Sequence, residues 1–138
     1  MPTNNPTYSL TVERQMLAKP AELYKAWTEE FGRWFAVAET VNMRAQVGEP
    51  FFFQTEFEGA RHPHYGRFLK LIKDEAIELT WLTSATLGAE TVVSVRFAAD
   101  GEGTRLSLTH SGFPTEDLRD RHDEAWPNVL EHQEKVLS

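Results

Sequence analysis

Two hydrophobic periodicities, one following the other along the chain, limit the folds open to this sequence. Between Phe51 and Gly112, apolar residues recur at every second position in a series of short segments. From Thr115 onward they recur at steps of three and four residues. The first period is typical of half-buried strands and the second of an amphipathic helix. Strands in succession, followed by one long helix, predict an α+β fold with an antiparallel sheet covered on one face.

Turn signals divide the chain into separate strands. The sequences GEP at residues 48–50, DE at 74–75 and DGEG at 100–103 favour tight turns, and the last is typical of a hairpin. Between the turns, alternating apolar residues predict strands over residues 8–16, 39–47, 51–59, 65–73, 76–84, 90–100 and 104–112. We therefore expect a sheet of about six to seven strands.

Helical segments are predicted on either side of the long strand region. In KPAELYKAWTEEF, residues 19–31, the apolar residues fall at helical spacing and Pro20 suits a first turn. Gly32 ends or bends this helix, and RWF at residues 33–35 is predicted to form a second short turn. Thr115 is expected to cap the final helix. Pro127 either kinks that helix or begins a second segment at its first turn.

Length and composition indicate an ordinary globular protein. A chain of 138 residues is long enough for one core, so we expect a single domain over residues 7–138 after a loose N-terminus at residues 1–6. The chain has no cysteine, signal-like N-terminus or 18-residue apolar run, which favours a cytoplasmic protein without a membrane span. The formal charge is 14 − 21 = −7, which disfavours a nucleic-acid partner.

Several segments resemble the helix-grip, START-like (SRPBCC) superfamily. They are VERQMLAKPAELYKAWT, WF, VGEPFFF, HYGRFLKLIKDEAIELTW, GEGTRLSLTHSGFP and AWPNVLEHQEKVL, and they span nearly the whole chain. Within the superfamily, the chain is most similar to bacterial homologues of the heat-shock-chaperone ATPase activator (activator of Hsp90 ATPase homologue-like). The resemblance implies a curved antiparallel sheet wrapped around a long C-terminal helix. Family members commonly carry glycine at the positions of Glu49 and Ala125, and these are local departures.

The fold implied by the resemblance can leave an apolar cavity between the sheet and the last helix. We expect a small, largely apolar or aromatic ligand there, because ligand sites are mostly apolar with a few placed polar groups. The expected lining residues are Trp34, Phe53, Trp81, His110, Phe113, His122 and Trp126. His110 continues the inward parity of its strand, and His122 lies on the apolar stripe of the last helix. These two histidines would orient a ligand hydroxyl, carbonyl or carboxylate.

Other interpretations stay open from the sequence. The aromatic residues could simply fill a core, with His110 packed and hydrogen-bonded. In an enzyme, His110 would act as an acid or base oriented by Glu56 or Glu58, as in cyclase- or dehydratase-like relatives. We expect no metal and no cofactor. The HPH sequence places two histidines close together, and His110 or His122 could be a third ligand, but no spacing matches a known metal motif such as H-E-x-x-H. His62 and His64 are expected in a solvent-facing loop.

Macromolecular partners are also considered. The acidic residues of the last helix could bind a basic partner, but a solvated helix face near its N-terminus is the simpler interpretation; they are Glu116, Asp117, Asp120, Asp123 and Glu124. A lone domain without a further chaperone-binding segment argues against stimulation of a chaperone ATPase. A homodimer is an alternative that the sequence neither favours nor excludes.

Overall fold

The computed structural model describes residues 7–137, so the N-terminus predicted to be loose, residues 1–6, lies outside the described residues. The elements are β1 (Tyr8–Met16), α1 (Pro20–Thr28), α2 (Phe31–Trp34), η1 (Ala38–Thr40), β2 (Pro50–Phe57), β3 (Ala60–Ile72), β4 (Ala76–Thr83), η2 (Ser84–Thr86), β5 (Thr91–Asp100), β6 (Gly103–Phe113) and α3 (Glu116–Leu137). This order confirms the predicted α+β fold.

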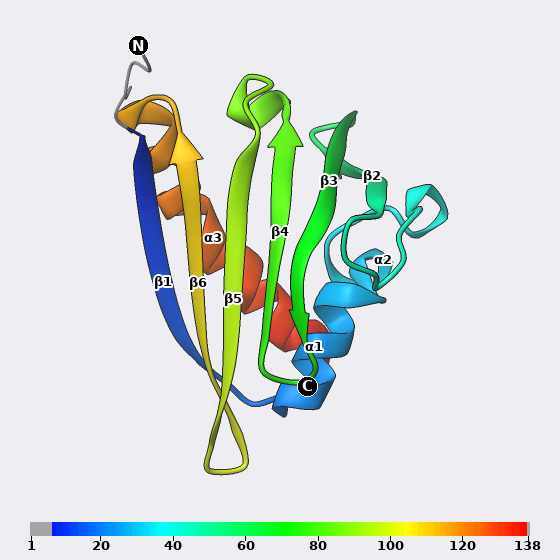
Figure 1. Ribbon diagram of the computed structural model, residues 1–138, viewed down its shortest axis with the longest axis vertical. Coiled ribbons are helices and arrows are strands. Elements are labelled where there is room, and N and C mark those ends of the chain that lie inside the picture. The colour runs from blue at the N-terminus through cyan, green and yellow to red at the C-terminus, as the bar shows by residue number, and fades with distance from the viewer. Residues whose placement is uncertain (1–6, 138) are drawn as a thin grey trace.

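The described strands form one six-stranded sheet in the order β1-β6-β5-β4-β3-β2 (Figure 1). Every neighbouring pair is antiparallel. The strands from β2 to β6 follow one another as hairpins, and β1 adds to the far edge beside β6, its partner from the other end of the chain. The predicted hairpin at residues 100–103 pairs Asp100 with Gly103.

One face of the sheet carries the core. The inward residues of the central strands are fully or almost fully buried, among them Val93 and Val95 on β5 and Leu106 and Leu108 on β6. In Figure 1, α3 crosses this face obliquely, α1 lies near the lower end of β3, and α2 lies on the side of β2. Removing this apolar surface from water is the main driving force for folding.

The segment over residues 39–47 was predicted to be a strand, and this prediction is wrong. The chain forms the short helix η1 there and then makes only two isolated bridges, Asn42 to Phe52 and Val47 to Phe68. Val41 and Met43 pack partly against the core, but Val47 is exposed. The alternation therefore marks an extended connection over the sheet edge, because continuous pairing, not alternation alone, makes a strand.

Strand β3 begins five residues before the predicted start at residue 65, so the HPH sequence is part of a strand. The prediction that His62 and His64 lie in a solvent-facing loop is wrong: His62 is half-buried and His64 is 7% exposed. Pro63 is tolerated because β3 pairs with β4 only from His64 onward, which leaves one side of the strand without a neighbour at Pro63.

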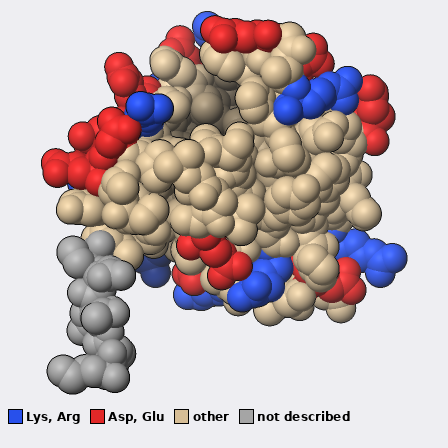
Figure 2. Space-filling model, turned by 90° about the horizontal axis from the view of Figure 1, so that it is seen from above, with Lys and Arg blue, Asp and Glu red and all other residues tan. Residues whose placement is uncertain are grey.

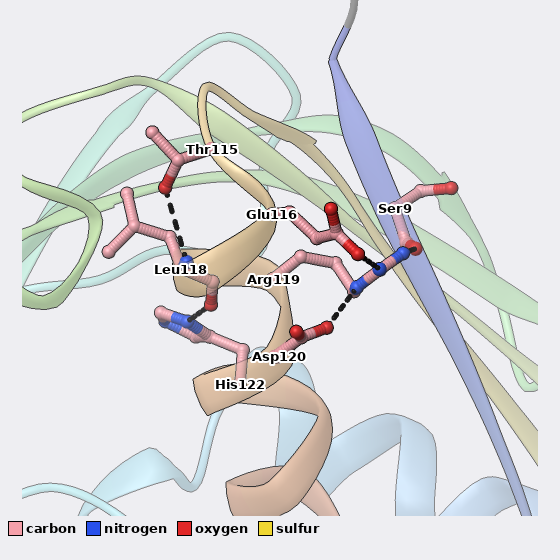
Figure 3. Close-up of polar contacts among 7 residues, drawn as sticks. All are labelled: Ser9, Thr115, Glu116, Leu118, Arg119, Asp120 and His122. Atoms are coloured by element: carbon pink, nitrogen blue, oxygen red, sulfur yellow. Dashed lines mark hydrogen bonds and ion pairs between the residues drawn. The ribbon is translucent and has the colours of Figure 1, made fainter.

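The last helix is continuous through Pro127. Asp123 and Pro127 are both exposed, so the Asp123 carbonyl that proline cannot pair lies on the solvent side of the helix. Thr115 caps the helix as predicted, because its hydroxyl accepts the Leu118 N–H at 3.2 Å (Figure 3). No helix within residues 7–137 combines the length and apolar character needed to span a bilayer.

Two side chains of α3 hold it to the edge strand β1. The Arg119 guanidinium donates to the Ser9 carbonyl at 3.2 Å (Figure 3). One turn from the other end of the helix, Glu134 forms an ion pair with Arg14 and accepts the Leu17 N–H at 3.1 Å. These contacts hold the helix against β1 at one edge of the sheet. They thereby determine the distance between the helix and the strands on the other side of β6.

Candidate functional site

A cavity of about 470 Å³ lies between α3 and the ends of β2, β3 and β4. It is lined by Phe35, Thr55, Phe57, His62, His64, Trp81, Thr83, Ser84, Ala85, His122, Ala125, Trp126 and Val129. Its size is that of a small-molecule site. Among the described residues, no Lys, Arg, Asp or Glu side chain belongs to this lining. Figure 2 looks at this end of the molecule, where charged side chains lie around the periphery and uncharged ones across the centre.

Aromatic rings form the walls of the cavity. Trp81 of β4 lies between the helix and the outer strands, with ring centroids 5.6 Å from Trp126, 5.6 Å from Phe35 and 5.0 Å from His64. Phe57, at the mouth, is 67% exposed, although it is large and apolar. An aromatic cage that opens at one end offers a ligand apolar area on several sides.

His64 presents one free ring nitrogen to this cavity. Its ring stacks on Phe53, with centroids 4.9 Å apart and planes at 13°, and its Nδ1 lies 3.1 Å from the His62 carbonyl oxygen. A carbonyl only accepts, so Nδ1 carries the proton. Burial lowers the pKa of His64 to about 4, although the bond to His62 opposes this shift. The ring is therefore neutral at pH 7, and its Nε2 is an acceptor.

His122 has the same arrangement on the opposite wall. Its Nδ1 donates to the Leu118 carbonyl one turn earlier in α3, at 2.8 Å (Figure 3). Burial lowers the pKa of His122 as well, again against the effect of the backbone hydrogen bond. In Figure 3 the His122 ring lies on the side of the helix away from Arg119 and β1.

His110 differs, because both of its ring nitrogens are engaged within the protein. The Trp126 indole N–H donates to Nδ1 at 3.1 Å, so Nε2 carries the proton and donates to the Thr91 hydroxyl at 2.7 Å. Thr91 donates in turn to the Trp81 carbonyl at 2.6 Å. This chain of hydrogen bonds joins α3 to β4 through two tryptophan residues that line the cavity. Burial, with a smaller effect of charge on His122, lowers the pKa of His110 to about 3.

A bulge at the end of β6 places a further aromatic residue behind the cavity. Between Tyr8 and Ser9 the register with β6 shifts by one residue, so Gly112, with φ of +90°, is inserted. His110 and Phe113 therefore face the same side although they are three residues apart, with ring centroids 4.3 Å apart.

Of the seven residues predicted to line the site, Trp81, His122 and Trp126 do so. The other four lie in the core directly behind the lining. Phe53 contacts His64, Phe113 contacts His122 at 4.8 Å, Trp34 contacts Phe35 at 5.5 Å, and His110 holds Trp126.

Several lining residues were not predicted from the sequence, and His64 is the most important of them. A signal for it was available: His64 has the parity of buried Phe68 on the same strand.

The alternatives weighed from the sequence have less support in the geometry. His110 has no free nitrogen for acid–base chemistry, and Glu56 is exposed and paired with Arg61 at 3.3 Å. Within residues 7–137, no three His, Asp or Glu side chains gather closely enough to hold a metal ion. On the acidic face of α3, Asp120 pairs with Arg119 (Figure 3). Asp117 pairs with Arg121, so neighbouring arginines neutralise part of this face.

The curved sheet, the long helix across its face and the cavity between them define a helix-grip α+β domain. A sequence model for the family described as Activator of Hsp90 ATPase homolog 1-like protein matches residues 17–138. The chain belongs to this family, which confirms the resemblance seen in the sequence.

Solved structures share the fold. Protein CV1439 from Chromobacterium violaceum is 20% identical, with a TM-score of 0.81 over 94% of this chain and 96% of that one. Protein MLL2253 from Mesorhizobium loti is 21% identical, with a TM-score of 0.77 over 94% of this chain and 96% of that one.

A third structure, DynU16, a protein in the dynemicin biosynthetic locus, is 14% identical with a TM-score of 0.76. The match covers 94% of this chain and 46% of that protein. At these identities the likeness shows the fold alone. A search of the curated proteins finds no match to this sequence.

Proposed function

We propose that this protein binds a small, largely apolar molecule in the cavity between α3 and strands β2–β4. The observation that carries the proposal is the cavity itself, whose volume of about 470 Å³ is bounded mainly by aromatic and other apolar side chains. Trp81 of β4 already contacts two other rings of the lining, Phe35, which follows α2, and Trp126 of α3. A site formed in advance in this way costs little reorganisation on binding.

The hydrogen-bond chain through His110 supports the same function. It fixes the two tryptophan residues without offering a free polar atom to the ligand. His110 is thus a positioning residue, and the polar atoms left for the ligand are those of the cavity wall. The fold suits ligand binding or a cyclase-like role, and we favour binding because the nitrogens of His110 are already engaged.

A thermal-shift screen tests the proposal. Naphthalene- and anthracene-sized compounds are expected to raise the melting temperature, because binding to the native state stabilises it by mass action. Val129→Trp would fill the cavity from α3, whereas Asn128→Trp places the same bulk on the exposed neighbouring position. We expect V129W to abolish the shift and N128W to retain it. Absence of any shift in the parent protein, or equal shifts in V129W and the parent, would contradict binding in this cavity.

A further inference from the structure

We propose that the ligand is an uncharged molecule whose hydroxyl or N–H group donates a hydrogen bond to Nε2 of His64 or His122. The inference rests on the proposed function and names the chemical class that this cavity selects. It follows from the protonation pattern of two imidazole rings that both line the site, one from β3 and one from α3.

Backbone contacts decide which tautomer the His64 and His122 rings adopt. In both rings Nδ1 donates a hydrogen bond to a backbone carbonyl. His64 donates to the carbonyl of His62, and His122 donates to the carbonyl of Leu118. Neither carbonyl can donate, so each neutral ring keeps its proton on Nδ1 and its lone pair on Nε2. Two backbone contacts therefore set the same polarity on opposite walls.

In the described part of the chain, the Nε2 lone pairs of His64 and His122 are unpaired and not fully buried. Within residues 7–137, neither Nε2 has a hydrogen-bond partner, and neither is among the fully buried polar atoms without a partner, which belong to Trp27 and Gln133. Both atoms therefore keep some accessible surface, and both residues line the cavity. An acceptor that is held in an apolar site without a partner favours any ligand that supplies the missing donor.

A ligand group that only accepts hydrogen bonds cannot pair with these two nitrogen atoms. A ligand carbonyl or carboxylate would bring an oxygen lone pair against the nitrogen lone pair, and a carboxylate would also find no Lys or Arg side chain in the described lining. The lowered pKa of both histidines keeps them from turning into donors at neutral pH. The hydroxyls of Thr55 and Ser84 adapt to either role, so within this lining it is the two Nε2 atoms that favour a donor on the ligand.

A matched series of naphthalene compounds tests the inference: 2-naphthol, 2-methoxynaphthalene and 2-naphthoate, titrated by calorimetry at pH 7.5. We expect 2-naphthol to bind about 3- to 10-fold tighter than 2-methoxynaphthalene, the gain of one hydrogen bond. The anion 2-naphthoate is expected to bind at least about tenfold more weakly than 2-naphthol, because its charge is desolvated without a partner.

Variants then locate the effect. In the double variant His64→Phe, His122→Phe, the aromatic walls remain but both acceptors are lost, so the preference for 2-naphthol should fall to within about twofold. His132→Phe, an exposed position on the same helix, should leave the preference unchanged. Equal binding of all three compounds by the parent protein, in a manner sensitive to V129W, would overturn donor selection while cavity binding stood. Failure of every compound to bind would overturn both proposals.

Discussion

Mild acid should destabilise this protein strongly, because two neutral histidines are buried in its native state. His64 is 7% exposed and His110 is fully buried. Burial is the main cause that lowers the pKa of His64 to about 4 and that of His110 to about 3. In the unfolded chain each pKa returns to about 6.5. Between these limits, unfolding takes up close to two protons.

The sign and size of the effect follow from this proton uptake. The unfolded state binds more protons below pH 6.5, so the free energy of unfolding falls as the pH falls, by about 1.4 kcal/mol per pH unit for each histidine. Both contributions are fully present above about pH 7 and are lost progressively towards pH 4 and 3. From pH 7 to pH 5 the combined loss is about 4 kcal/mol, a large part of the 5–15 kcal/mol that is typical of a domain. The lowered pKa of His122 acts in the same direction.

Urea unfolding at pH 7, 6 and 5, followed by tryptophan fluorescence, measures this loss directly. Side-chain carboxyl groups titrate mainly below about pH 5, so the window isolates histidine. His64→Phe should reduce the slope against pH by about 1.4 kcal/mol per unit, because one of the two main groups is gone. His132→Gln, on the exposed face of α3, should keep the parent slope. A parent protein equally stable at pH 7 and 5, or an H64F variant with the parent slope, would refute the reasoning.

Two further predictions concern the contacts that hold α3 on the sheet. Glu134→Ala removes the carboxylate that binds β1 and should lower the free energy of unfolding by about 1–3 kcal/mol. The control Glu131→Ala breaks an exposed ion pair within the helix and should change that free energy by less than about 0.5 kcal/mol. Equal costs in the two variants would contradict the role of Glu134. His110→Leu should lower the free energy of unfolding by about 1–3 kcal/mol, because it leaves the Trp126 indole N–H buried without an acceptor. Adding Trp126→Phe should recover part of that loss. Strictly additive losses of the two substitutions in urea unfolding would argue against the hydrogen bond.

The order of elements was predictable from the sequence because it depends on local signals. Alternation, the hairpin at residues 100–103 and the cap at Thr115 are each decided by neighbours within a few positions, and all three are found in the structure. The segment over residues 39–47 shows where this reasoning fails. Its alternation is as regular as that of a strand, but pairing needs a neighbouring strand with a free edge along its whole length. Only Asn42 and Val47 meet one.

The roles of the histidines were less predictable, because parity alone does not settle them. His110 and His64 both face inward, as buried residues of the same strands do. His110 lies between β1 and β5, opposite Leu10 and Val93, where the protein surrounds it completely. In such a place a polar ring persists only with both nitrogens satisfied, and Trp126 and Thr91 satisfy them.

His64 has the same parity but lies where the sheet runs out. It is opposite Thr83, the last residue of β4, and the next residues of β3 towards its start have no β4 partner. One side of the ring is therefore covered by Phe53 and the other opens on the cavity. His110 and His64 thus differ in their distance from the end of the neighbouring strand. That distance separates the structural histidine from the one that is available to a ligand. In this fold the cavity begins where β4 ends, so the histidine opposite the last residue of β4 is a stronger functional candidate than His110, which lies between two paired strands.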